Sequence, residues 1–214
     1  MTEPSSILLV FGREPVPGKT KTRLGRTLGM DTACELYCQM LSYVLEMSRE
    51  VSNERRLYLP AGDVVQGERF ALEGWTQHPQ VSGDIGARMK GAFEEAFAAG
   101  AERAVLVGSD IPSLTADILE RAFAALDEAE MVFGPARDGG YYLIGQRAPS
   151  RNVYDNITWS TAEVWSQTEA HLQTQGISYA VVDVLDDLDD EDALHRYLTE
   201  GGPCPLALPE KLSD

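Results

Sequence analysis

The feature of this sequence that most constrains its fold is the alternation of short apolar runs with longer segments of helical periodicity. Runs typical of buried strands occupy 7–11, 56–60, 104–107, 131–133, 141–144 and 177–182, with a weaker candidate at 75–76. Between them, apolar residues recur at helical spacing over 33–45, 85–97, 118–126, 160–173 and 190–198. Strands that alternate with helices favour a mostly parallel sheet covered on both faces. We therefore expect an α/β fold of the Rossmann-like, three-layer αβα type.

Local signals predict where several of these helices begin and end. Asp31 and Thr115 are residue types that cap helix N-termini, and the segment 160–163 has the pattern of a capping box. Gly100 and Gly176 stand where a left-handed residue would close a helix.

Length and charge bound the domain organisation and the partners. The chain has 214 residues and no linker or repeat, so we expect one domain over 1–199 and a surface tail over 200–214. A formal net charge of −16 repels nucleic acid and anionic lipid, so neither nucleic acid nor a membrane is an expected partner. The first residues lack the basic region of a signal peptide, and Cys34, Cys38 and Cys204 form no CxxC pair. We expect a soluble cytoplasmic protein with free, buried thiols.

The segment 12–24, which follows the first predicted strand, concentrates positive charge in this acidic chain. Gly12 and Gly18 allow its backbone to approach a ligand closely, and two prolines stiffen it. Charge-assisted hydrogen bonds to phosphate suit its basic side chains, which are Arg13, Lys19, Lys21 and Arg23. The alternative is a solvated surface loop. A Walker-type phosphate loop is disfavoured because five residues, two of them prolines, separate Gly12 from Gly18.

Two aspartates follow predicted strands at the edge where ligands of such sheets bind. Asp110 stands just past the run 104–107, where a carboxylate suits Mg²⁺ completed by substrate phosphates, or organises the following turn. Asp138 precedes Gly139 and Gly140, and Asp-Gly is also the strongest hairpin-turn dipeptide. Asp138 is therefore a turn residue, a second metal ligand or a base for an acceptor.

Other polar segments are less specific. Gly83 and Arg88 flank the start of a predicted helix, where a polar ligand could bind, although Asp84 fits a simple N-cap equally well. The acidic run 186–192 is interpreted mainly as capping and solvation of the last helix. The histidines are scattered without metal-ligand spacing, and Ser109 lacks the GxSxG context of a hydrolase nucleophile.

Several of these segments together resemble a known family. The segment 11–24, FGREPVPGKTKTRL, resembles the opening motif of GT-A-like transferases known as nucleotide-diphospho-sugar transferases, often encoded near radical-SAM or selenium-related genes. The resemblance continues, in the same order, through 80–89, 108–112, 134–145 and 157–160, and covers most of 7–199. More distantly, the chain is similar to guanylyltransferases that act on phospholactate or on the molybdenum cofactor.

The resemblance implies a Rossmann-like sheet of the GT-A type, a nucleotide on the N-terminal half and a divalent cation, Mg²⁺ or Mn²⁺, on Asp110. GT-A enzymes usually hold the metal with an Asp-x-Asp pair. This sequence has Gly-Ser-Asp at 108–110, so one aspartate carries over.

We therefore expect a metal-assisted glycosyltransferase that uses a nucleotide-diphospho-sugar donor and a small acceptor. The alternatives are a nucleotidyltransferase, which joins a nucleotide to a phosphorylated acceptor and releases pyrophosphate, and a non-catalytic nucleotide-binding protein; the oligomeric state stays open. Asp110 is the expected metal ligand and Asp138 the expected catalytic carboxylate. The nucleotide would contact Gly12, Arg13, Gly18, Lys21, Arg23, Gly83 and Arg88. The sugar and acceptor would contact Gly139, Gly140, Tyr141 and Trp159.

Overall fold

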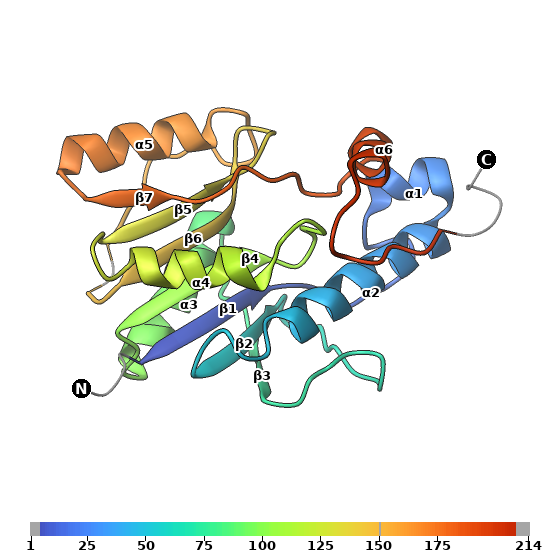
Figure 1. The fold of residues 1–214 in the computed structure, drawn as a ribbon, viewed down its shortest axis with the longest axis horizontal. Coiled ribbons are helices and arrows are strands. Elements are labelled where there is room, and N and C mark those ends of the chain that lie inside the picture. Colours follow the sequence, from blue (N-terminus) through green and yellow to red (C-terminus); the bar gives the residue numbers. More distant parts are fainter. Residues whose placement is uncertain (1–4, 150, 209–214) are drawn as a thin grey trace.

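The structure, a computed structural model that describes residues 5–149 and 151–208, contains a seven-stranded sheet in the order β3-β2-β1-β4-β6-β5-β7 (Figure 1). Its strands are β1 (Ser6–Phe11), β2 (Glu54–Leu59), β3 (Trp75–Pro79), β4 (Arg103–Gly108), β5 (Met131–Pro135), β6 (Tyr141–Arg147) and β7 (Tyr179–Val181). β6 runs antiparallel to both of its neighbours, and the other adjacent pairs are parallel. The predicted mostly parallel sheet is confirmed.

Helices cover both faces of this sheet, as Figure 1 shows. α2 (Met30–Met47) and α4 (Ala116–Ala125) pack on one face, and α3 (Ile85–Ala98) and α5 (Val164–Gln175) pack on the other. Two further helices, α1 (Thr22–Leu28) and α6 (Glu191–Glu200), lie beside each other beyond the carboxyl ends of the strands. The three-layer αβα architecture is thus confirmed.

The central strand β1 shows why the sheet needs both layers. Leu8 and Val10 point into the apolar cluster under α2 and α4, whereas Ile7 and Leu9 join the cluster under α3. Because successive side chains of a strand point to opposite faces, an uninterrupted apolar run must be covered on both sides.

The antiparallel strand comes from a tight turn between β5 and β6. Ala136 N donates to Gly140 O at 3.0 Å, and Gly139, with φ of 92°, occupies the left-handed region that this turn requires. As β6 returns antiparallel, the carboxyl end of β5 and the start of β6 lie at the same edge as the carboxyl ends of β1 and β4. The turn therefore carries its residues to the edge at which ligands of such sheets bind.

Some predicted helix boundaries are confirmed and two are wrong. Thr115 caps α4 by accepting from Ile118 N. Asp31 lies in the first turn of α2, whose N-cap is Gly29. The predicted capping box does not form, because Ser160 adopts a left-handed φ of 63° and α5 begins only at Val164. α1 begins inside the segment 12–24, which was predicted as a loop, and runs on to Leu28.

The described part of the C-terminal segment packs along the edge that α6 occupies. Cys204 is buried, its N–H donates to Pro112 O, and Ala207 N donates to the side chain of Gln39. The three cysteines are free and buried, as expected. Residues 209–214 of the predicted tail lie outside the described residues, and the division at 199 stays a prediction. Within the described ranges, every helix is too short or too polar to cross a bilayer.

Candidate functional site

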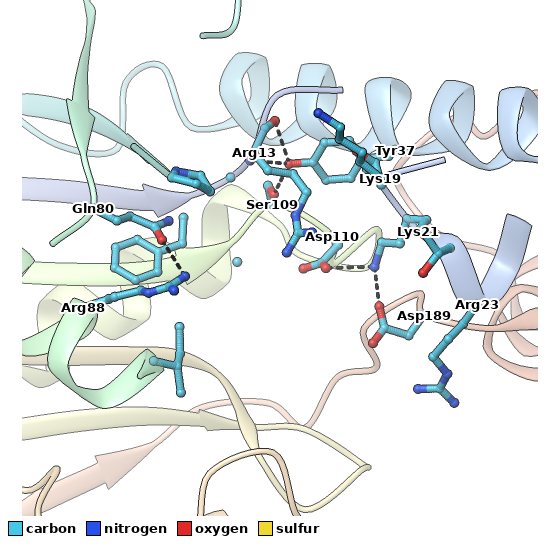
Figure 2. A pocket seen from close by; sticks show the side chains of 17 residues that line it. Arg13, Lys19, Lys21, Arg23, Tyr37, Gln80, Arg88, Ser109, Asp110 and Asp189 are labelled. Carbon is cyan, nitrogen blue, oxygen red and sulfur yellow. Dashed lines mark hydrogen bonds and ion pairs between the residues drawn. The ribbon is translucent and has the colours of Figure 1, made fainter. Parts of the chain in front are cut away.

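The carboxyl ends of β1 and β4 open onto a cavity of about 390 Å³, here called the first cavity (Figure 2). The segment after β1 and the start of α1 form one wall, and the N-terminal turn of α3 forms the opposite wall. This is the edge at which ligands of open α/β sheets bind. Its basic lining residues are Arg13, Lys19, Lys21, Arg23 and Arg88.

Lys21 is the centre of the polar contacts in this cavity. It is the N-cap of α1 in a left-handed conformation with φ of 50°, which turns its side chain inward, and the side chain is only 6% exposed. Its Nζ donates to Asp110 Oδ2 at 2.8 Å and to Asp189 Oδ1 at 2.5 Å. The expectation that the basic segment and Asp110 share one edge of the sheet is therefore met.

The charges of this triplet depend on one another. Burial alone would raise the pKa of Asp110, but the ammonium of Lys21 outweighs burial and holds that pKa below its usual value. Burial likewise lowers the pKa of Lys21, and the carboxylates of Asp110 and Asp189 reverse the effect and raise it. Lys21 and Asp110 are consequently both charged at neutral pH.

Asp189 was not among the predicted site residues, because the acidic run 186–192 was interpreted as solvation of α6. Asp190 does cap that helix by accepting from Ala193 N. However, the buried Leu188 donates its N–H to Asp110 O, and this contact places Asp187 and Asp189 beside Asp110. The signal in the sequence was the single apolar residue inside the acidic run.

The start of the basic segment is held in place by buried hydrogen bonds. The hydroxyl of Tyr37 accepts from Arg13 N at 2.9 Å and bonds to Ser109 Oγ at 2.9 Å. Gly12 N donates to Tyr58 O, so the backbone here continues the sheet. The Arg13 side chain itself is exposed and free to meet a ligand. Because the backbone is fixed before any ligand arrives, binding orders mainly side chains.

The opposite wall presents Arg88. Its Nε donates to Gly83 O at 3.0 Å and its Nη1 to Gln80 Oε1 at 3.3 Å, which leaves the rest of the guanidinium directed across the cavity (Figure 2). Gly83 has φ of 127° and supplies its carbonyl rather than lining the cavity. Asp84 accepts from Ala87 N, so it is the N-cap of α3.

A second cavity of about 300 Å³ adjoins the first and shares Phe11, Ile85, Gly108 and Asp110 with it. Asp138 and Asp187 line it together with Tyr141 and other apolar side chains of the sheet. Burial, together with the negative charges of Asp189, Asp138 and Asp110, raises the pKa of Asp187 to about 6. This carboxyl group also went unpredicted.

The predicted site residues separate into two groups. The first cavity contains Gly12, Arg13, Lys21, Arg23, Arg88 and Asp110, and the second contains Asp110, Asp138, Gly140 and Tyr141. Gly18, Gly83, Gly139 and Trp159 line neither cavity.

Two of these exceptions have clear physical reasons. A Cβ on Gly139 would lie 2.2 Å from Ala162 O, so this glycine faces protein rather than ligand. The Trp159 ring packs on Gly86 of α3 and meets Tyr141 edge-on at 6.4 Å, so it supports the second cavity from behind. Asp138 Oδ1 accepts from Gly140 N at 2.9 Å, which confirms its part in the turn while it lines the second cavity.

A protein-only metal centre is absent from residues 5–149 and 151–208, where no three His, Cys, Asp or Glu side chains are grouped to hold an ion. Mg²⁺ needs only one or two carboxylates when phosphates and waters supply the other ligands. Asp110 and Asp187, which line the second cavity together, meet this smaller requirement.

The sheet order and the position of the cavities define an α/β fold shared by nucleotidyltransferases and nucleotide-sugar transferases. Within that class, the chain belongs to the family described as "Uncharacterized protein conserved in bacteria (DUF2064)", whose model matches residues 44–161.

Three relatives illustrate the similarity. A Desulfovibrio desulfuricans G20 protein, assigned by name only to the nucleotide-diphospho-sugar transferases, is 33% identical, with a TM-score of 0.83 over 92% of this chain and 88% of that one. The phosphoenolpyruvate guanylyltransferase of Chloroflexus aggregans (strain MD-66 / DSM 9485) is 22% identical over 86% of this chain and 93% of its own length. The inositol-1-phosphate CTP transferase of T. maritima is 15% identical, with a TM-score of 0.53 over 95% of this chain and 100% of that one. The first confirms the family resemblance, and the last shows the shared fold.

Proposed function

We propose that this chain is a nucleotidyltransferase, which transfers the nucleotidyl group of a nucleoside triphosphate to a small acceptor and releases pyrophosphate. The observation that carries the proposal is the convergence of Arg13, Lys19, Lys21, Arg23 and Arg88 on one cavity beside Asp110. The sequence alone favoured a sugar donor. The named relatives favour the alternative, because a guanylyltransferase matches nearly the whole chain and a CTP transferase shares its fold.

The basic side chains suit a triphosphate better than a nucleotide-sugar. A nucleoside triphosphate carries more negative charge than a sugar diphosphate, and its pyrophosphate leaving group must be stabilised as it departs. Arg13 and Lys19 are exposed and can turn toward phosphates, and Arg88 approaches from the other wall. Arg23 is exposed as well but must first release Asp190, to which its Nη2 donates at 2.9 Å. Each charge-assisted contact contributes roughly 1.5–3 kcal/mol, so two or three of them suffice for micromolar binding.

We further propose that Asp110, with Asp187 as second carboxylate, holds Mg²⁺ or Mn²⁺ together with the phosphates. Burial and the negative charges of Asp189, Asp138 and Asp110 together raise the pKa of Asp187, and a divalent cation would relieve the repulsion between these carboxylates. The cation would neutralise charge on the transferred phosphoryl group. Lys21 and the arginines orient the phosphates, and Asp138, in the adjoining cavity, takes the proton of the acceptor.

The experiment separates the two transfer reactions without a known acceptor, because slow hydrolysis reveals the donor. The protein is incubated with Mn²⁺ and with separate pools of nucleoside triphosphates and nucleotide-sugars, and pyrophosphate and nucleoside diphosphate are followed. Pyrophosphate release that is lost in Asp110→Asn but kept in the exposed Asp31→Asn supports the proposal.

The other outcomes are equally distinct. Nucleoside diphosphate release from a nucleotide-sugar, with every triphosphate intact, would restore the sugar transferase that the name of the Desulfovibrio relative favours. Binding of nucleotides by calorimetry without either release would identify a non-catalytic nucleotide-binding protein.

A further inference from the structure

The two adjoining cavities differ sharply in charge. The first contains five basic side chains, Arg13, Lys19, Lys21, Arg23 and Arg88, against the carboxylates of Asp110 and Asp189. The second contains three carboxylates, those of Asp110, Asp138 and Asp187, and none of the described residues that line it is a lysine, arginine or histidine. The boundary between these two environments runs through Asp110, which belongs to both.

Several cations around the second cavity are already paired, whereas Arg13, which is unpaired within the described residues and whose charge acts on Asp110, lines the first cavity instead. Lys21 Nζ is held by Asp110 and Asp189. Arg137 lies on the outer side of the turn near Glu200, at 3.8 Å, and Arg196 donates to Asp186 at 3.0 Å. Thus no unpaired basic side chain that the structure describes lines the second cavity and could receive an anionic group there.

The remaining walls of the second cavity are mostly apolar. Met89 comes from α3, Leu106 from β4, Ile111 from the turn after β4, and Tyr141 and Ile144 from β6. A cavity of about 300 Å³ with such walls accommodates the body of a small ring or a short branched chain. Of its three carboxylates, only that of Asp110 is shared with the first cavity.

We propose that the acceptor of the transfer is not a phosphate ester but an uncharged or cationic molecule with an apolar body and a hydroxyl or amine nucleophile. This proposal rests on the proposed function and names the class of its second substrate. With the proposed cation on Asp110 and Asp187, the carboxylate of Asp138 still faces the acceptor, and no basic side chain among the described lining residues offsets it, which selects against an anion. The two named relatives are called after phosphorylated compounds, so the acceptor class is where this chain departs from them.

The transfer is balanced without a further reactant. The hydroxyl oxygen, or amine nitrogen, of the acceptor forms a bond to the α-phosphorus while the bond from that phosphorus to the pyrophosphate oxygen breaks. Pyrophosphate retains the electron pair and stays among the basic side chains of the first cavity. The proton of the nucleophile passes to the carboxylate of Asp138 at the acceptor side.

The test uses three fluorinated probes of nearly equal shape and different charge: para-fluorobenzyl alcohol, para-fluorobenzylamine and para-fluorobenzyl phosphate. Their binding to the full chain is titrated by fluorine NMR, once with EDTA and once with Mg²⁺. We expect the amine and the alcohol to bind at least about tenfold more tightly than the phosphate under both conditions, and Ala136→Phe, which fills the second cavity, to abolish their binding.

A charge reversal makes the test specific for the site. Asp138→Lys, at an exposed position, should weaken binding of the amine and strengthen binding of the phosphate. The matched control Glu68→Lys, on the exposed segment between β2 and β3, should leave the binding of both probes unchanged. Tighter binding of the phosphate than of the alcohol to the wild type, with or without Mg²⁺, would overturn the proposal. So would failure of both the amine and the alcohol to bind, or equal effects of the two lysine variants.

The outcome is independent of the donor reaction. If the probes rank as expected but pyrophosphate is never released from a triphosphate, the proposed acceptor class is supported and the proposed nucleotidyl transfer is rejected. If pyrophosphate is released and the phosphate probe ranks first, the transfer stands and the acceptor class fails.

Discussion

At Lys21, one ammonium group is shared by two carboxylates that the chain brings from distant positions. A buried ion pair contributes little compared with apolar packing, but removal of one partner leaves charges uncompensated and is strongly destabilising. The position therefore has two roles that a sequence cannot separate. It stabilises the metal-free protein through Asp110 and Asp189, and under the proposed function it would offer a donor to the phosphates of a nucleotide.

Lys21→Ala should consequently lower both stability and nucleotide affinity. We expect the free energy of unfolding to fall by about 1–3 kcal/mol, less than for a fully buried pair, because Asp110 and Asp189 remain partly hydrated. Urea unfolding and calorimetry with nucleotide measure the two effects. The matched variant Lys19→Ala, at an exposed lysine of the same cavity, should reduce affinity alone. Equal unfolding free energies for wild type and Lys21→Ala would contradict the role of the ion pair.

Asp187 gives the metal-free protein a pH-dependent stability. Its pKa is raised from 3.8 to about 6, so between these values the folded chain holds a proton that the unfolded chain has released. The free energy of unfolding should therefore fall as the pH rises from about 4 to 6. Asp187→Asn removes this loss. With EDTA present, we expect the free energy of unfolding of the variant to exceed that of the wild type by about 1–2 kcal/mol at pH 8 and to equal it near pH 4. A constant difference across this pH range would assign the effect to packing instead.

At the scale of elements, the site depends on how α3 meets the segment before α5. Gly86 lies in the first turn of α3, and an added Cβ would lie 2.5 Å from Cζ2 of Trp159. The Trp159 ring in turn meets Tyr141 of β6, which lines the second cavity. Glycine is thus required at position 86 because α3 and the segment before α5 approach each other closely there. Since Trp159 lies between α3 and Tyr141, the position of α3 determines where this wall of the second cavity lies.

Gly86→Ala should destabilise the protein by about 1–3 kcal/mol, because the ring must move, although alanine favours the helix by up to about 1 kcal/mol. In Gly86→Ala/Trp159→Leu the smaller side chain makes room, so this double variant should be more stable than the sum of the two single effects. Chemical denaturation of all four proteins completes the cycle. Strict additivity would mean that the two residues do not clash.

At the scale of the whole molecule, the layers could be predicted and the meeting of distant segments could not. The apolar runs and helical periods identified the strands and the four covering helices, because burial determines both patterns. They also placed Asp110 and the basic segment at one edge, since the carboxyl ends of parallel strands share it. Asp187 and Asp189 escaped prediction, because their role depends on Leu188 packing beside Asp110 across the fold. The same limit applies to Trp159. Its aromatic ring suggested contact with a bound ligand, but in the structure the ring packs on Gly86 and Tyr141 and supports the wall of the second cavity.

The ion pair between Lys21 and Asp189 also affects when, during synthesis of the chain, the first cavity can be completed. The contact joins residues 168 positions apart, so the lysine leaves the ribosome long before its second carboxylate does. At 5–20 residues per second, this interval lasts roughly ten to thirty seconds. Before Asp189 emerges, the nascent chain can form β1, α2 and β4 one after another but cannot hold Lys21 in its final place. The nucleotide binding proposed above is therefore a property that the growing chain would acquire late, after nearly all of its sheet has been made.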